Sequence, residues 1–335
     1  MLKFAIIGVG GMGKVHLRNV VELVAKRDDV KLVALCDVEE SRFTEEIITN
    51  LGGDSSPFDL SDFKLYTDVY ELLKCEKLDF VISATPTYLH EKIAILCLEN
   101  DLHVFSEKPM AISLAACQQM INVAQEKGKL LMIGQCLRYS SEYVKLKELI
   151  ADRKYGNVIR AEFKRYSPTP KWSWQNWLLD YEKSGCAALD LHVHDVDFIN
   201  WTFGVPISVT SFATNAVSKF DSLFTAYNYG DILVTSAVDW GFPDSHPFDV
   251  SFLVRLDDAV IEMDGINLKV YPHGHEKFIL DLKQINPYMA EIDDFISRIQ
   301  NNEKLEVVTP ESAMDTVKIV LAEIDSAQSG SSVYI

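Results

Sequence analysis

A lysine beside a proline, at the end of an apolar segment, is the first group of residues in this sequence that could do chemistry. Residues 103–108 have the character of a buried strand that ends in Lys108, and Pro109 follows. Proline fixes its own φ angle and confines the residue before it to extended geometry, so we expect Lys108 to be held in one direction. A held ammonium group can hydrogen-bond a substrate oxygen whose charge changes during a reaction. The alternative is a solvated lysine that only ends a strand.

Asp190, His194 and Asp197 form the second group. They are spaced i, i+4 and i+7 in a segment that we expect to be one helix from about residue 187 to Gly204. At about 100° per residue this spacing predicts one polar stripe on an otherwise apolar helix, and buried polar groups need partners. We expect Asp190 to orient the imidazole of His194 and to favour its charged form, which suits a proton shuttle.

Two other interpretations of this polar stripe are a hydrogen-bonded core histidine and a metal site. The stripe lacks a second histidine and any cysteine, which are common zinc ligands, so we expect no metal. Whether His194 is a proton shuttle or a core histidine depends on where the stripe lies in the fold.

The elements that position these groups follow from the first half of the chain, which alternates between apolar segments and helical patterns. We expect strands at residues 3–8, 31–37, 64–67, 79–85, 103–108 and 130–135, helices at 12–26, 39–51, 88–100 and 113–127, and a polar surface loop at 52–63. Continuous apolar strands separated by helices indicate a parallel sheet covered on both faces. Six such strands predict a doubly wound Rossmann fold.

A glycine-rich turn directly after the first strand is typical of a dinucleotide site. It has the pattern Gly8-x-Gly10-x-x-Gly13 and opens a helix. Gly8 allows the tight turn, Gly10 lets the backbone approach a pyrophosphate, and Gly13 lets the helix pack on the strand. The helix N-terminus stabilises the anion. We therefore assign Gly11 and Met12, which lie within the turn, to the cofactor site as well.

Asp37, at the end of the second strand, indicates which dinucleotide binds. An acidic residue there accepts hydrogen bonds from the adenine ribose and repels a 2′-phosphate. Arg42 comes five residues later, where a helix can direct it elsewhere. The sequence therefore favours NAD as the cofactor, with NADP as the less favoured alternative.

The ends of the last three strands should line the nicotinamide half of the site. Ligands in this fold bind at the carboxyl ends of the strands, where the strand order reverses. Those ends are residues 83–87, 106–109 and 134–139. Lys108 lies in the second of them, so its ammonium group should project to the place where a hydride would be transferred.

These motifs together resemble the Gfo/Idh/MocA oxidoreductase family. The resemblance rests on the glycine motif at 8–13, Ala-Thr-Pro at 84–86, Glu-Lys-Pro at 107–109 and Asp-x-x-x-His at 190–194, and segments 286–299 and 309–327 resemble the C-terminal helices of that family. It covers essentially the whole chain. It implies NAD(P)-dependent hydride transfer to or from a hydroxyl or keto carbon of a sugar, inositol or related polyol.

The resemblance also implies roles for single residues. Lys108 is the lysine that contacts the reacting hydroxyl, His194 is the general acid and base, and Asp190 assists by a hydrogen bond to the substrate or to the histidine. The residues implied at the cofactor are Thr85, Pro86, His90 and Glu107. Many members have asparagine after the sixth strand; this chain has Gln135, which we expect to contact the nicotinamide.

A second domain is expected from the change of pattern after about residue 155. Several alternating strands in series predict an open, mostly antiparallel sheet. We divide the chain into a dinucleotide-binding domain at 1–137 and an α+β substrate-binding and oligomerisation domain at 138–335. Its last helices, at about 288–301 and 310–328, should pack the domains together. The resemblance implies a homodimer or homotetramer formed through the sheet.

Aromatic residues dominate the stretch that is richest in substrate candidates, residues 166–180. It holds Trp172, Trp174 and Trp177, and aromatic faces suit the C–H faces of sugar rings in a cleft between domains. We expect substrate contacts from Trp172 foremost, and from Arg138, Tyr139 and Tyr166. The alternative is that these aromatic side chains fill the protein core.

Composition excludes some partners and indicates a compartment. The formal net charge is −17, which argues against nucleic acid and anionic membranes because both attract basic surfaces. The six cysteines are widely spaced, so we expect them to be buried free thiols in a reducing compartment. No apolar stretch approaches the ~18 residues of a membrane span, and the N-terminal apolar run breaks into glycines. We expect a soluble cytoplasmic protein.

Two further functions remain open at this stage. Some relatives use tightly held NAD for transient oxidation followed by elimination, and so act as glycosidases. Others bind NAD as regulators without catalysis. Loss of the lysine or the histidine would favour a regulator, and this sequence has both.

Overall fold

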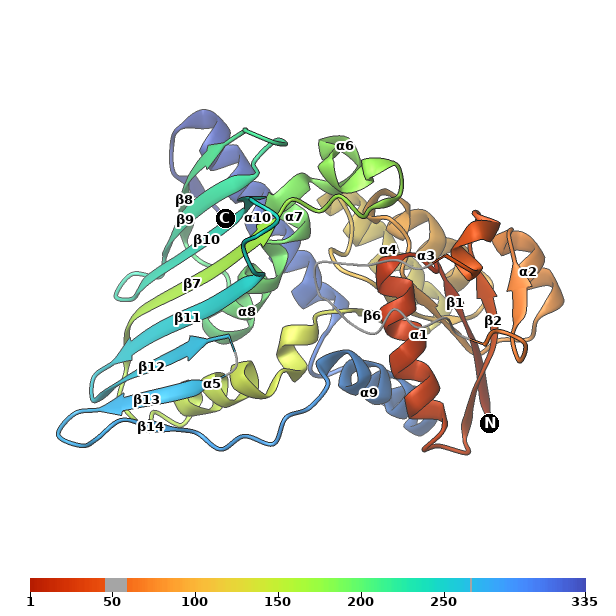
Figure 1. The fold of residues 1–335 in the computed structure, drawn as a ribbon, viewed down its shortest axis with the longest axis horizontal. Helices are drawn as coiled ribbons and strands as arrows, with labels where there is room; N and C mark the ends of the chain where they lie inside the picture. The colour runs from red at the N-terminus through yellow and green to blue at the C-terminus, as the bar shows by residue number, and fades with distance from the viewer. Residues whose placement is uncertain (46–58, 266) are drawn as a thin grey trace.

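Two β-sheets lie side by side and carry the helices of the protein (Figure 1). The structure is a computed structural model and describes residues 1–45, 59–265 and 267–335. Part of the expected helix at 39–51 and most of the expected loop at 52–63 lie outside the described residues. The described part of that helix is a 3₁₀ turn, Glu40–Phe43.

The first sheet has six parallel strands in the order β3-β2-β1-β4-β5-β6. The strands are β1 (Leu2–Ile7), β2 (Val30–Cys36), β3 (Lys64–Tyr66), β4 (Phe80–Ser83), β5 (His103–Ser106) and β6 (Leu131–Ile133). This is the order of a doubly wound dinucleotide fold, so the predicted fold is confirmed. The central strands are mostly apolar because helices cover both faces: Phe4 stacks on Phe80 with ring centroids 4.5 Å apart.

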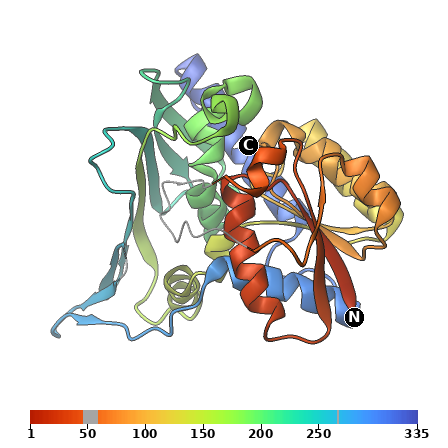
Figure 2. The same ribbon diagram turned by 45° about the vertical axis from the view of Figure 1, so that its right-hand side comes forward.

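Helices α1 and α9 lie on one face of this sheet, and α3 and α4 lie on the other (Figure 2). The helices of the first half are α1 (Gly11–Val24), α2 (Val69–Cys75), α3 (His90–Glu99), α4 (Leu114–Lys127) and α5 (Ser141–Ala151). The C-terminal helices are α9 (Pro287–Asn301) and α10 (Pro310–Ser329). Phe295 of α9 meets Phe80 and Phe105 edge to face, which fixes this late helix on the first sheet.

The second sheet has nine strands in the order β14-β13-β12-β11-β7-β10-β9-β8-β15. They are β7 (Val158–Pro168), β8 (Ser208–Thr214), β9 (Ser222–Asn228), β10 (Leu233–Phe242), β11 (Asp249–Leu256), β12 (Ala259–Asp264), β13 (Leu268–Pro272), β14 (Phe278–Ile279) and β15 (Val333–Tyr334). Among these strands β7 and β10 pair in parallel and the other pairs are antiparallel. The predicted open, mostly antiparallel sheet is confirmed.

One face of the second sheet is covered by helices, and the other is open (Figure 1). Phe163 and Phe252 on the covered face meet Phe198 of α8 (Val193–Phe203) and Tyr143 of α5. The open face carries exposed apolar side chains, among them Phe212, which is 67% exposed. No described helix is long and apolar enough to cross a membrane. All six cysteines are free; five are buried, and Cys75 is exposed.

The helix expected at about 187–204 is broken into two. These are α7 (Cys186–Asp190) and α8 (Val193–Phe203), and they follow the short α6 (Tyr181–Ser184). The turn between them carries His192, whose Nε2 lies 3.3 Å from Glu323 of α10 within the core. Asp190 and His194 are therefore on different helices, and the i, i+4 spacing does not place them on one stripe.

Candidate active site

A cavity of about 500 Å³ extends from the glycine turn to the tryptophan-rich loop. It is lined by the carboxyl ends of the first sheet and by α7, α8 and β7 of the second part of the chain. The predicted site residues that line it are Gly8, Gly10, Gly11, Met12, Asp37, Thr85, Pro86, Glu107, Lys108, Trp172, Asp190 and His194. Sequence positions that are far apart thus meet in one space.

The glycine turn has the shape that a pyrophosphate needs. Gly8 has φ +88°, and a Cβ there would lie 2.6 Å from Ala84 O. A Cβ on Gly13, which is buried behind the turn, would lie 1.9 Å from Gly8 O. A Cβ on Gly10 would meet no described atom within 4 Å, because this residue faces the cavity. The backbone at the N-terminus of α1 is therefore open to an anion.

Asp37 lies beside this turn and is fixed by backbone donors. Its Oδ2 accepts a hydrogen bond from Val9 N at 2.7 Å and its Oδ1 accepts one from Glu39 N at 3.0 Å. We expected that a helix could direct Arg42 elsewhere, but Arg42 lines the cavity, with its Nη1 3.1 Å from Glu45 Oε2. The end of the cavity that suits an adenosine thus has an acid and a cation.

Glu107 and His90 support the strand ends in different ways. Glu107 Oε1 lies 2.6 Å from His16 Nε2. Burial alone would raise the pKa of Glu107, but the hydrogen bond from His16 and the nearby charges lower it below its usual value. His90 does not line the cavity; its ring nitrogens lie 2.7 Å from Pro109 O and 2.9 Å from Thr85 O. His90 therefore holds two cavity-lining segments from behind.

Lys108 links the two parts of the molecule. Its Nζ donates to Asp190 O at 2.8 Å and lies 3.2 Å from Asp190 Oδ1. The lysine side chain is 12% exposed. The Lys108–Pro109 peptide bond is cis. The two contacts with Asp190 show that α7 orients the ammonium group. The sequence predicted only that Lys108 would be held in extended geometry at the end of β5.

His194 is partly buried at the same end of the cavity, and its surroundings differ from the expectation. Its Nδ1 has no hydrogen-bond partner among the described residues. Burial, and then the charges of Lys108 and Arg165, lower the pKa of His194 well below its usual value. The expected charged imidazole is therefore wrong, and so is its orientation by Asp190, because the helix break turns Asp190 toward Lys108.

Gln135 is the expected nicotinamide contact that does not reach the cavity. Its side chain is buried, and the cavity wall is formed by its neighbours Gly134 and Cys136. Both its Oε1 and its Nε2 are without a hydrogen-bond partner among the described residues. Gln135 precedes the 3₁₀ turn Cys136–Tyr139, and its side chain is only 2% exposed.

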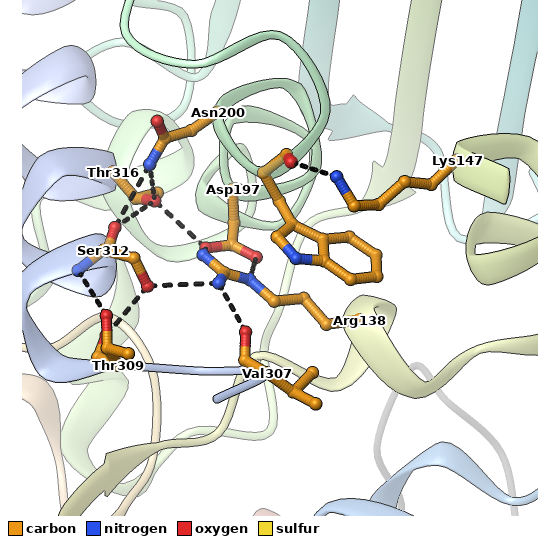
Figure 3. A network of polar contacts seen from close by, with 9 residues as sticks. Arg138, Lys147, Asp197, Asn200, Val307, Thr309, Ser312 and Thr316 are labelled. Atoms are coloured by element: carbon orange, nitrogen blue, oxygen red, sulfur yellow. Dashed lines mark hydrogen bonds and ion pairs between the residues drawn. The ribbon is translucent and has the colours of Figure 1, made fainter. Parts of the chain in front are cut away.

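Arg138, expected at the substrate, belongs to a buried network instead (Figure 3). Its Nε and Nη2 donate to both oxygens of Asp197 at 2.8 and 2.7 Å. Its Nη1 donates to Val307 O and Ser312 Oγ. Tyr139 is likewise occupied, since its Oη donates to Asp294 at 2.6 Å. Neither residue lines the cavity, so both assignments are corrected.

We expect Arg138→Leu to lower the free energy of unfolding by about 3–5 kcal/mol, because Asp197 would remain as an uncompensated buried charge. The two side chains are only 2% and 1% exposed. Urea unfolding measures this loss. Lys26→Ala, which breaks an ion pair with side chains 61% and 60% exposed, should cost about 0.5 kcal/mol or less. A change in substrate KM without a loss of stability would contradict this role of Arg138.

The strand β7 explains why Tyr166 was the wrong choice. Side chains alternate between the faces of a strand, so Arg165 and Ser167 line the cavity while Tyr166 stacks on Phe242, with centroids 5.1 Å apart. Arg165 is held by two hydrogen bonds to buried Asp195, at 2.8 and 3.0 Å. The sequence predicted that side chains alternate along this strand, but it did not predict which of the two faces lines the cavity.

Aromatic side chains form the wall opposite the glycine turn. The three tryptophans of the aromatic stretch, Trp172, Trp174 and Trp177, all line the cavity. Four other aromatic residues that were not predicted also line it, namely Tyr70, Trp240, Phe248 and Tyr288. Tyr288 lies in a segment that carried the family resemblance, which was the available signal. The described residues contain no group of three or more His, Cys, Asp or Glu side chains that could hold a metal ion.

Comparison with family models decides the relationship of the chain. Residues 2–135 match the oxidoreductase family with an NAD-binding Rossmann fold, and residues 143–259 match the Gfo/Idh/MocA C-terminal domain. The chain belongs to the Gfo/Idh/MocA family. Like the fold, this relationship was predicted from the motifs.

Two curated relatives illustrate the breadth of the Gfo/Idh/MocA family. A myo-inositol 2-dehydrogenase of Thermotoga maritima is 30% identical over 206 residues, which are 61% of this chain and 55% of the relative. The match thus spans little more than half the length of that relative. A 2,7-anhydro-N-acetylneuraminate hydratase of Mediterraneibacter gnavus is 27% identical over 289 residues, 83% of this chain and 71% of the relative.

The fold is shared along its whole length with solved structures of Gfo/Idh/MocA-like architecture. An oxidoreductase from Agrobacterium radiobacter, solved in complex with NAD+, L-tartaric acid and magnesium, superimposes with a TM-score of 0.83. The alignment covers 99% of this chain and 98% of that chain at 18% identity. At this identity the likeness establishes the fold.

Proposed function

We propose that this Gfo/Idh/MocA protein is an NAD(P)-dependent dehydrogenase or reductase that acts on a CH–OH or keto carbon of a sugar, inositol or related polyol. The observation that carries the proposal is the meeting of Lys108, Asp190 and His194 in one cavity with the glycine turn. The bound nicotinamide would supply the acceptor or donor of a hydride at the Lys108 end.

The roles of the chain's own residues follow from their charge and contacts. His194 is held neutral by burial, so it can accept the proton of a substrate hydroxyl. Lys108 presents an oriented ammonium group that stabilises negative charge on the substrate oxygen. Asp190 fixes that ammonium group. In the reverse reaction, the protonated imidazole of His194 returns the proton to the oxygen.

The cofactor would be held by the residues that already have the required geometry. The N-terminus of α1 and Gly10 would bind the pyrophosphate, and Asp37 would accept hydrogen bonds from the adenine ribose. Thr85, Pro86 and Glu107 line the route to Lys108. We propose NAD rather than NADP, because the carboxylate of Asp37 would repel a 2′-phosphate.

Asp37→Ser should lower the ratio of kcat/KM for NAD to that for NADP by about tenfold to a hundredfold, since it removes one repulsive charge and leaves Arg42 nearby. Initial rates with both cofactors measure the ratio. Asp79→Ser is the matched control: Asp79 also accepts a backbone N–H at 2.7 Å, from Lys3, but outside the cavity. An unchanged ratio in Asp37→Ser would contradict the assignment of Asp37.

The proposal is tested by NADH fluorescence over a panel of sugars, inositols and their keto forms, with NAD and NADP in both directions. At least one pair is expected to give a change in NADH or NADPH that depends on the protein. Absence of turnover across the panel, in a protein that binds NADH, would overturn the proposed function.

A glycosidase or lyase that uses transient oxidation is the second candidate. The hydratase from Mediterraneibacter gnavus, which matches 83% of this chain at 27% identity, is the relative that supports this candidate. The two candidates differ in stoichiometry, because a transient oxidation gives product without net NADH. A non-catalytic regulator is less well supported, since Lys108 and His194 both line the cavity.

We also propose that two or four copies associate through the open face of the second sheet. Phe212 and Phe224 on this face are 67% and 44% exposed, and apolar side chains of this size favour burial. The partners would thus be a small neutral substrate and further copies of the chain. Light scattering of the purified protein measures the number of copies, and a monomer would contradict this association.

A further inference from the structure

A second cavity, of about 550 Å³, adjoins the first. Trp172 and Phe248 line both cavities, so they are a shared wall. The remaining lining of the second cavity includes Lys171, Asp244 and His246. We call this space, which is largely open to solvent, the outer cavity.

The shared wall stands next to the reacting end of the first cavity. The guanidinium carbon of Arg165 lies 5.9 Å from the centre of the Phe248 ring. Arg165 also lines the first cavity, as Lys108 and His194 do. The outer cavity is therefore separated by the Trp172 and Phe248 side chains from the cavity that holds the proposed proton acceptor.

The polar groups of the outer cavity can both donate and accept hydrogen bonds. Lys171 Nζ donates to both oxygens of Asp244 at 3.0 and 2.8 Å, and the two side chains are 67% and 71% exposed. Such an exposed pair contributes little to stability and can exchange its bonds with a ligand. His246 Nδ1 lies 2.7 Å from Pro247 O, which only accepts, so Nδ1 donates and Nε2 is the acceptor of the neutral ring.

This combination of groups favours an uncharged, hydroxylated ring. Two aromatic side chains, Trp172 and Phe248, offer apolar faces, and Lys171, Asp244 and His246 supply donors and acceptors for hydroxyl groups. The ammonium group of Lys171 and the carboxylate of Asp244 balance each other, so the outer cavity has no net charge from this pair to favour an anionic or cationic ligand. The chemistry of the outer cavity therefore resembles what a second sugar ring requires.

We propose that the substrate is a glycoside: the ring that is oxidised occupies the first cavity, and a second neutral sugar ring occupies the outer cavity against Trp172 and Phe248. This inference rests on the proposed function, because it assigns the first ring to the cavity that holds Lys108 and His194. The role of the outer cavity is recognition, and no residue there takes part in the proton or hydride steps.

The test compares kcat/KM for three pairs of compounds by NADH fluorescence: glucose and cellobiose, galactose and lactose, and myo-inositol and galactinol. The two-ring compound of at least one pair should have the higher kcat/KM. Asp244→Ala and Lys171→Ala should each lower the ratio of two-ring to one-ring kcat/KM by about tenfold, the loss expected for a hydrogen bond to a charged group. Lys183→Ala is the matched control, because it breaks an exposed pair with Asp180 outside both cavities.

The outcomes separate this inference from the proposed function. Turnover of one-ring compounds, without a preference for two rings and with the same ratio in Asp244→Ala, would overturn the outer cavity as a sugar site and leave the proposed function standing. Absence of all turnover would overturn the proposed function. In that case the affinity of the protein for the same compounds, measured by quenching of tryptophan fluorescence, still tests the outer cavity. If Asp244→Ala binds the two-ring compounds with the affinity of the wild type, the inference is overturned.

Discussion

Replacing Lys108 with alanine is expected to lower kcat by about 10²–10³, the loss typical of one oriented donor to a developing negative charge. The reason is that the Lys108 ammonium group, fixed by Asp190 O at 2.8 Å, is the cation placed at the reacting end of the cavity. Steady-state rates of the wild type and of Lys108→Ala on the best substrate of the panel measure the effect.

The control for this change is Lys127→Ala. Lys127 makes the same kind of contacts, since its Nζ donates to Glu99 O at 3.0 Å and lies 3.6 Å from Asp101 Oδ1, but it is outside the cavity. Its replacement should leave kcat unchanged. NADH binding by Lys108→Ala, followed by fluorescence, shows that the first domain is intact. Turnover within a few-fold of the wild type would refute the role of Lys108.

His194→Ala is expected to lower kcat by about 10²–10⁴, the usual contribution of a general acid and base. The direction of the pH dependence follows from burial and from the charges of Lys108 and Arg165, which lower the pKa of His194 well below 6.5. The imidazole is then neutral at pH 7, and the neutral form accepts the proton. Oxidation should therefore persist as the pH falls through 6.5, with its acid limb below the value of an ordinary histidine.

A pH profile of kcat/KM for oxidation measures this limb, which should disappear in His194→Ala. His103→Asn is the comparison, because burial also lowers the pKa of His103, to about 4, although this residue lies outside the cavity. Its profile should match that of the wild type. An acid limb centred at or above 6.5, or one that survives in His194→Ala, would be evidence against the assignment of His194.

The elements of the first sheet could be predicted because their signal is local. Strands covered on both faces are apolar throughout, and the glycine turn after β1 has few other uses in that position. The proximity of Lys108 and His194 could also be predicted. The fold brings the strand ends, including Lys108, to one edge of the sheet, and the family resemblance implied that His194 acts at the same site. None of these inferences required knowing how distant side chains pair.

The errors concern residues whose partners lie far away in the sequence. Asp190 turned to Lys108 because the helix breaks at His192, which lies 3.3 Å from Glu323. Arg138 was taken for a substrate ligand because its pairing with Asp197 depends on tertiary packing. Such buried pairs leave no periodic signal, so sequence alone did not separate a structural cation from a functional one.

Because Lys108 contacts Asp190, the position of its ammonium group depends on the spacing between the two sheets. A dinucleotide on the first sheet and a polyol against the second would be aligned through the same ammonium group, although each is held by separate elements. A displacement of about 1 Å can cost on the order of a hundredfold in rate. The side chains that fasten one sheet to the other, although remote from any reacting atom, therefore set the tolerance within which hydride transfer can occur.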